Sequence, residues 1–347
     1  MKFAQKEPNF ERFLKMLRCE PTDRPVLFEA FMNEPLYRKL AGHGPEDDSE
    51  LAHLRMVVDA FARGGYDYAQ VYGSAFSFPT KAAAHLQTIS LNEGFVITDR
   101  ASFDTYDWPD PDDFDYSRLE KIVPFLPQGM KLMAVGPGGV LENTISLVGY
   151  ENLCYMLYDD PNLVRAIFDA VGSRLVRYYE RVAAYDSVGV LMANDDWGFN
   201  TQTFLSLEDM RKYVFPWHKR IVQAAHKQGK PALLHSCGYM GEVMEDIIEN
   251  MCFDGKHSYE DNILPVEDSY RRWGGRIAIL GGVDLNFITR ATPDEIRARC
   301  AALLELTSAT GGYALGSGNS IPEYVPWENY FAMINTALEA YIHRGKI

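Results

Sequence analysis

The sequence predicts an α/β protein built as a (β/α)8 TIM barrel. Eight short apolar runs, rich in Val, Ile, Leu or Tyr, recur along the 347 residues, and each is short enough to be a buried strand. Helical stretches fit between most of these runs, which is the alternation expected of a barrel. The alternative is a doubly wound open sheet, but no Gly-x-Gly-x-x-Gly pattern follows the first run.

The eight strand candidates can be given in chain order. They are PVLFEAF from Pro25, YDYAQVYG from Tyr66, KLMAVGPG from Lys131, VGVLMAND from Val188, PALLHSCG from Pro231, FDGKHSYE from Phe253, IAILGGVD from Ile277 and GYALGSGN from Gly312.

Two of the intervening helices carry clear start signals. The stretch 159–185 has apolar residues at three- and four-residue spacing, with Asp160 as an N-cap ahead of Pro161. Thr292-Pro-Asp-Glu295 has a capping-box pattern with the same proline placement. Ser206-Leu-Glu-Asp209 is a weaker version of the same signal.

Composition limits the class of protein. We expect one domain over residues 1–347, with a short N-terminal helical extension before the barrel. The net charge of −14 argues against a nucleic-acid surface, which needs a basic face. No apolar run is long enough for a membrane span, and the charged start does not resemble a signal peptide. The five scattered cysteines fit reduced thiols, so we expect a cytoplasmic protein.

In a barrel the chemistry lies where the strands end, and these ends carry polar residues. We expect Glu29, Tyr72, Asn194, His257 and Asn319 to bind substrate at this rim. Asp195 and Asp196 end the fourth strand and are candidates for catalysis, together with Glu260. Adjacent acids point in different directions, so only one of the two aspartates should enter the barrel, and the sequence leaves open which.

His235 and Cys237 end the fifth strand two residues apart. Side chains alternate along a strand, so this imidazole and thiol share a face, as a pair of zinc ligands would. Gly238 then allows a sharp turn. On its own, such a pair is more often a buried histidine beside a small packed cysteine, since two ligands do not define a metal site.

Four blocks of sequence favour the metal-site interpretation of His235 and Cys237: residues 136–164, 193–238, 274–300 and 316–334. In order and spacing they resemble the uroporphyrinogen decarboxylase superfamily, which includes true decarboxylases and methyltransferases that work with corrinoid proteins. The resemblance covers most of the chain and implies a (β/α)8 barrel, which agrees with the independent count of strands.

The resemblance is nearer to the methyltransferases. True uroporphyrinogen decarboxylases carry an arginine-rich signature after the first strand, which grips the carboxylates of the porphyrinogen. The equivalent segment here, residues 28–34, holds Glu29 and Glu34 instead. In the thiol-methylating members, zinc is held at the positions of His235 and Cys237 and by a cysteine in a Gly-Cys-Gly segment. That segment reads Gly-Ser-Gly here, with Ser317 in place of the third ligand.

A third ligand must therefore come from elsewhere. Glu260 is our first choice, because its strand follows that of His235 and consecutive strands are usually neighbours in a barrel. The other candidates are His257, Asp196, Asp284 and Asn319. A histidine, cysteine and carboxylate set suits activation of an oxygen better than of a sulfur.

Together with these residues, the resemblance implies an enzyme that moves a methyl group between a small substrate, such as a methoxylated one, and the cobalt of a corrinoid protein, with help from zinc. No Asp-x-His-x-x-Gly pattern occurs, so the cobalamin would arrive on a separate partner. The alternatives are a decarboxylase of a small carboxylated substrate and a non-catalytic protein that binds a tetrapyrrole or corrinoid. Dimers are common in the superfamily, so a homodimer is also open.

Overall fold

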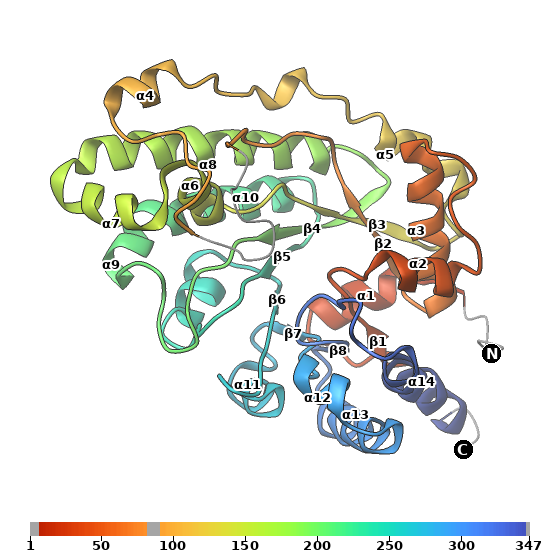
Figure 1. Ribbon diagram of the computed structural model, residues 1–347. Helices are drawn as coiled ribbons and strands as arrows, with labels where there is room; N and C mark the ends of the chain where they lie inside the picture. Colours follow the sequence, from red (N-terminus) through yellow and green to blue (C-terminus); the bar gives the residue numbers. More distant parts are fainter. Residues whose placement is uncertain (1–6, 82–90, 345–347) are drawn as a thin grey trace.

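The computed structural model describes residues 7–81 and 91–344, and it confirms the predicted α/β barrel class (Figure 1). Eight parallel strands form one curled sheet in the order β1-β8-β7-β6-β5-β4-β3-β2. The strands are β1 (Val26–Leu27), β2 (Tyr68–Tyr72), β3 (Lys131–Val135), β4 (Val188–Asn194), β5 (Ala232–His235), β6 (Gly255–His257), β7 (Ala278–Leu280) and β8 (Tyr313–Leu315). Each of the eight predicted runs contains one of these strands.

The barrel has a seam between β1 and β2, which stand at the two ends of the strand order. Strand β1 has only two residues and pairs with β8. A side chain bridges the seam instead of a backbone ladder. The hydroxyl of Tyr68 accepts a hydrogen bond from the Glu29 amide at 2.8 Å and donates to the Glu29 carbonyl at 2.7 Å. This link fixes the start of the loop that follows β1.

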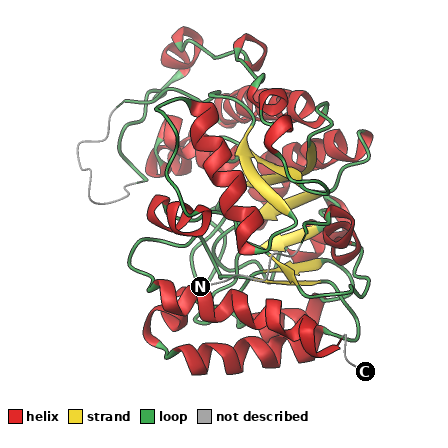
Figure 2. Ribbon diagram, turned by 90° about the vertical axis from the view of Figure 1, so that its right-hand side faces the viewer, coloured by secondary structure: helices red, strands yellow, loops and turns green. Residues whose placement is uncertain are grey.

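Helices surround the curled sheet on its outer side (Figure 2). They are α1 (Phe10–Leu17), α2 (Glu34–Ala41), α3 (Glu50–Gly64), α4 (Arg100–Thr105), α5 (Arg118–Lys121), α6 (Val140–Val148), α7 (Tyr150–Asp159), α8 (Pro161–Ala183), α9 (Leu207–Asp209), α10 (Phe215–Lys227), α11 (Val266–Trp273), α12 (Leu285–Arg290), α13 (Pro293–Thr307) and α14 (Trp327–Arg344). Two 3₁₀ turns, η1 (Pro111–Asp113) and η2 (Val123–Phe125), and two π-helical turns, η3 (Met210–Val214) and η4 (Asp246–Asn250), complete the described elements.

The predicted helix starts are confirmed. The Asp160 side chain accepts from the Leu163 amide at the start of α8, where Pro161 is the first residue. Thr292 and Glu295 form the expected capping box at the start of α13. Ser206 caps the short helix α9 through the Asp209 amide. No helix in the described residues is long and apolar enough to span a membrane.

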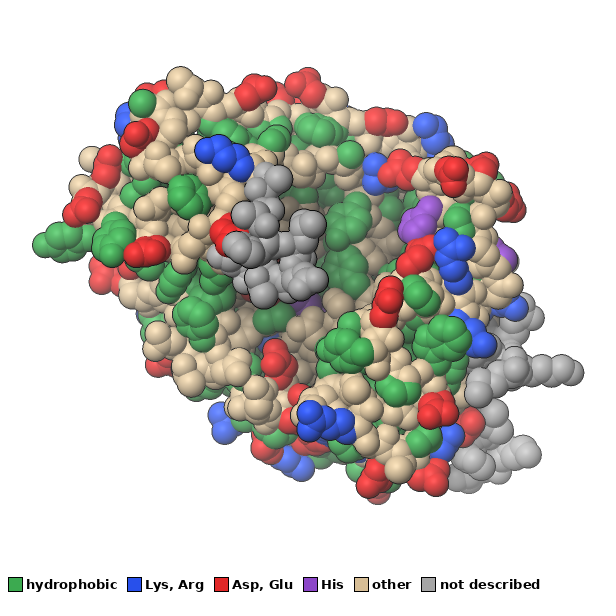
Figure 3. Space-filling view, viewed as in Figure 1, with side chains coloured by type: hydrophobic (Ala, Val, Ile, Leu, Met, Phe, Trp, Pro, Cys, Tyr) green, Lys and Arg blue, Asp and Glu red, His purple; other side chains and the backbone are tan. Residues whose placement is uncertain are grey.

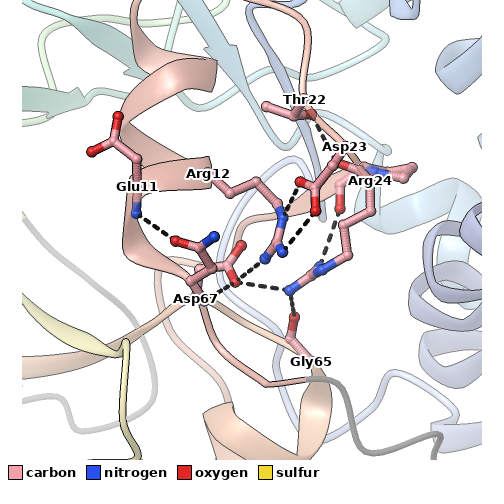
Figure 4. A network of polar contacts seen from close by, with 9 residues as sticks. Glu11, Arg12, Thr22, Asp23, Arg24, Gly65 and Asp67 are labelled. Atoms are coloured by element: carbon pink, nitrogen blue, oxygen red, sulfur yellow. Dashed lines mark hydrogen bonds and ion pairs between the residues drawn. The ribbon is translucent and has the colours of Figure 1, made fainter.

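A buried charged cluster ties α1 to the amino ends of β1 and β2 (Figure 4). The Asp67 carboxylate, at zero exposure, accepts from the Arg12 guanidinium at 2.6 Å and from the Arg24 guanidinium at 2.8 Å. Arg12 also binds Asp23. The cluster lies at the amino ends of these strands, so it supports the barrel at the end opposite to the polar rim.

Candidate functional site

Three neighbouring strands bring three of the predicted residues into one row. The pairing register sets Asn194 of β4 opposite His235 of β5, and His235 opposite His257 of β6. All three stand at the last position of their strands, so the row lies at the carboxyl end of the barrel. The residues that follow in each chain then build the site.

The candidate metal cluster consists of Asp196, His235 and Cys237. One ligand atom from each side chain lies within 4.8 Å of the other two. The Cys237 Sγ is 3.8 Å from His235 Nε2, which confirms that these two side chains share a face. The Cys237 amide donates to Asp196 Oδ1 at 2.8 Å, so the two loops after β4 and β5 hold each other in register.

The structure corrects our choice of Glu260 as the third member of this cluster. Strand β5 has two neighbours, and the preceding strand β4 places Asp196 beside Cys237. Strand β6 ends at His257, and the chain leaves the sheet before it reaches Glu260. Glu260 lies nearby, within electrostatic reach of Asp196, Asp284 and Lys256, but outside the cluster.

Asp195 lies in a different environment from Asp196. Its buried carboxylate accepts from the backbone amides of Leu141 and Glu142, at 3.0 and 2.9 Å, and from His218 Nε2 at 2.7 Å. It therefore caps the start of α6, whose N-cap residue, Gly139, has no side chain to do so. Of the two adjacent aspartates, Asp196 is the one that belongs to the metal cluster.

Burial determines the protonation of the cluster. It lowers the pKa of His235 to about 4, so this imidazole is neutral at physiological pH and can offer a lone pair. Burial, followed by the charge of Asp196, raises the pKa of the Cys237 thiol. The Asn319 side-chain amide donates to Cys237 Sγ at 3.2 Å, which is a contact that favours the thiolate. The cluster thus offers one nitrogen, one sulfur and one oxygen.

A cavity of about 920 Å³ opens at the carboxyl ends of β6, β7 and β8, and none of the three cluster residues lines it. Glu260 and Asn319 both line it, and Asn319 connects it to Cys237. Its acidic lining residues are Glu260, Asp261, Asp284 and Glu295, and its basic one is Arg290. Figure 3 shows that one face of the molecule is hollowed near its centre, with hydrophobic side chains along one side of the hollow; the picture does not label the residues of this cavity.

The predicted substrate contacts divide into two groups. Tyr72 is 43% exposed and its ring stacks on Phe31, and Asn319 lines the cavity. Asn194 is half-buried beside His235, and its side-chain oxygen has no partner among the described residues. These three remain candidates for substrate binding.

Glu29 and His257 do not line the cavity. Both have zero exposure. Glu29 is hydrogen-bonded to Ser317, and the His257 ring contacts His235 through Nδ1, 2.8 Å from His235 Nδ1. Neither side chain is exposed in this structure, so we do not carry them forward as substrate contacts. The sequence placed them correctly at strand ends, but their side chains point into the packed interior of the barrel.

Two further ionisable residues, Lys256 and Glu142, lie near the cluster and were not among the predicted site residues. Lys256 is buried, its Nζ donates to the Ser258 carbonyl and lies 4.2 Å from the Tyr259 ring centre, and burial lowers its pKa to about 8. Burial and the charges of Asp195 and Asp196 raise the pKa of Glu142 to about 8. The sequence signal for Lys256 was a lysine within a run predicted to be a buried strand, because lysine is rarely buried.

The comparisons with known proteins agree with this geometry. A family model described as uroporphyrinogen decarboxylase (URO-D) matches residues 98–340. The chain belongs to this family. The match includes the strands that carry Asp196, His235, Cys237 and Ser317, so the candidate site lies within the family domain.

Relatives in this family are similar at low identity. The uroporphyrinogen decarboxylase of Anaeromyxobacter dehalogenans (strain 2CP-C) is 28% identical over 193 residues, which is 54% of this chain and 51% of that protein. The chain thus spans about half the length of that relative. The uroporphyrinogen decarboxylase of Alkalilimnicola ehrlichii is 23% identical over 349 residues, 94% of this chain and 92% of that protein.

One solved structure has the same fold over its full length. It is a methyltransferase from Methanosarcina mazei, with a TM-score of 0.71 and 16% sequence identity, covering 97% of this chain and 100% of that one. At this identity the likeness shows the fold.

Proposed function

We propose that this protein is a zinc-dependent methyltransferase that moves a methyl group between a small substrate and the cobalt of a separate corrinoid protein. The observation that carries the proposal is the Asp196, His235 and Cys237 cluster at the carboxyl end of the barrel, where Asn319 connects Cys237 to a cavity. Three mixed donors with an open side are the usual arrangement of a catalytic zinc site. A zinc ion bound there would polarise the heteroatom that gains or loses the methyl group.

The residues of the chain have distinct parts in this proposal. His235, Cys237 and Asp196 would hold the ion, with His235 neutral and Asn319 supporting the cysteine sulfur. Glu260 lines the cavity, and burial raises its pKa, which makes it our candidate for proton exchange with the substrate oxygen. Tyr72, Asn194 and Asn319 are the candidate substrate contacts.

The charge of the cavity argues against uroporphyrinogen as the substrate. A substrate with many carboxylates needs several fixed cations, and the cavity is lined by four acids, Glu260, Asp261, Asp284 and Glu295, against one exposed arginine, Arg290. A second candidate function is decarboxylation of a small substrate. The buried Lys256 favours it, because its ammonium group could bind the substrate carboxylate.

The test compares metal content in matched variants. We expect near-stoichiometric zinc in the purified wild-type protein and in Glu260→Gln, and a loss of zinc affinity of about tenfold or more in Asp196→Asn and His235→Gln. Methyl transfer to added cob(I)alamin should fall with the metal. Wild-type protein that takes up no zinc would defeat the proposal and favour the decarboxylase. Zinc loss in Glu260→Gln but not in Asp196→Asn would show that Glu260, and not Asp196, is the third ligand.

A further inference from the structure

His257 is placed to act on His235 rather than on a substrate. Its ring has zero exposure and lies in the barrel interior, with its centre 5.0 Å from that of Phe28. Its two ring nitrogens face different partners. Nδ1 is 2.8 Å from His235 Nδ1, and Nε2 is 3.1 Å from the carbonyl oxygen of Ser317.

The partners determine where the protons lie. A carbonyl oxygen can only accept, so His257 Nε2 must carry a proton. Two nitrogens 2.8 Å apart cannot both be donors. A second proton on His257 would leave a charged ring with zero exposure and no carboxylate hydrogen-bonded to it among the described residues, which is costly. Neutral His257 therefore accepts at Nδ1, and His235 must donate from its own Nδ1. The lone pair of neutral His235 is then on Nε2, the atom that lies 3.8 Å from Cys237 Sγ.

The Ser317 carbonyl that starts this chain is itself fixed. The Ser317 amide donates to Glu29 Oε1 at 3.0 Å, and its hydroxyl lies 2.6 Å from Glu29 Oε2. Both neighbours must be glycine, because a Cβ at Gly316 would lie 1.7 Å from the Phe28 carbonyl and one at Gly318 would lie 2.2 Å from the Tyr259 carbonyl. The Gly-Ser-Gly segment thus holds the Ser317 peptide against His257.

We propose that His257 is a positioning residue that, oriented by the Ser317 carbonyl, locks His235 in the tautomer whose unprotonated Nε2 faces Cys237. The role of this tautomer as a metal ligand rests on the proposed function, whereas the tautomer itself does not. Position 317 then contributes its backbone to the site, whereas the thiol-methylating members of the superfamily carry a cysteine ligand there.

The first experiment measures the tautomer in metal-free protein. In protein with ¹⁵N-labelled histidine, long-range ¹H–¹⁵N spectra should show His235 protonated at Nδ1 and unprotonated at Nε2, with the signal assigned by its loss in His235→Gln. A His235 proton at Nε2 would overturn the inference whether or not zinc binds. Failure of the wild-type protein to bind zinc would instead overturn the proposed function, and the spectrum would still decide the tautomer.

The second experiment uses a pair of variants at position 257. His257→Phe keeps an aromatic ring against Phe28 but removes the acceptor, so we expect mixed His235 tautomers and a zinc or cobalt(II) affinity lower by about 10- to 100-fold. His257→Gln can donate to the Ser317 carbonyl and accept from His235, so it should recover most of the affinity and the Nδ1-protonated signal. Equal metal affinity and an unchanged tautomer in His257→Phe would overturn the positioning role.

Discussion

At the scale of single residues, Glu29 is a buried acid whose pKa is raised by folding. Its carboxyl group has zero exposure and contacts the amide and hydroxyl of Ser317, and no cation pairs with it among the described residues. Burial raises its pKa from 4.5 to about 8, although both hydrogen bonds from Ser317 act in the opposite direction. The folded protein therefore keeps a proton on Glu29 at neutral pH that the unfolded chain would release.

This residue predicts a dependence of stability on pH. Between about pH 4.5 and pH 8 the folded state binds more protons at Glu29 than the unfolded state does, so its contribution to stability falls as the pH rises. Glu29→Gln mimics the protonated acid and removes this dependence. We expect the melting temperature of Glu29→Gln, relative to that of the wild type, to increase as the pH rises from 5 to 8. The exposed control Glu208→Gln should show no such trend, and a constant difference between Glu29→Gln and wild type would contradict the shifted pKa.

At the scale of elements, the end of β4 joins the start of α6 and one face of α10. Asp195 accepts from the first amides of α6 and from His218 of α10, so one carboxylate fixes two helices to the sheet. Gly139 is required at this junction, because a Cβ there would lie 2.0 Å from the Asp195 side chain. The next residue, Asp196, leaves this junction and enters the metal cluster.

The two adjacent aspartates should therefore respond differently to the same substitution. Asp195→Asn places an amide among donors in a buried position, so we expect the metal-free protein to lose about 1–3 kcal/mol of unfolding free energy. Asp196→Asn keeps the oxygen that accepts from the Cys237 amide and should change the stability of the metal-free protein much less. Urea unfolding without zinc measures both. Equal losses in the two variants would contradict this division of roles.

At the scale of the whole molecule, the barrel is held at its two ends by different means. At the carboxyl end the cluster and the Ser317 contacts join β4, β5, β6 and β8. At the amino end, Asp67 and the guanidiniums of Arg12 and Arg24 join α1 to the two strands that border the seam. Because β1 and β2 lack a backbone ladder, these side chains carry the closure of the barrel.

Asp67→Asn should destabilise the fold strongly, because it leaves two buried guanidiniums without their shared carboxylate. The expected loss is about 3–5 kcal/mol of unfolding free energy. The matched control is Asp112→Asn, whose carboxylate binds Arg177 and Arg181 at the exposed surface and should contribute little. Thermal or urea unfolding checks the pair, and similar effects of the two substitutions would show that the seam does not depend on Asp67.

Local patterns in the sequence were enough to predict the eight strands, the starts of α8, α9 and α13, and two of the three cluster residues. The period of the apolar runs predicted the eight strands, and the capping residues Asp160 and Thr292 marked helix starts, because both signals act over a few neighbouring residues. His235 and Cys237 share a face for the same reason, since alternation along a strand is a local property.

The rest depended on contacts between strands. Whether Asp196 or Glu260 approaches Cys237 is set by the register of β4 on β5 and by the residue at which the chain leaves β6. The burial of Glu29 and His257 likewise follows from which way each strand end faces in the closed barrel. These are relations between residues 22 to 288 positions apart. The sequence determined which chemical groups reach the rim, and the packing of the strands determined which of them meet.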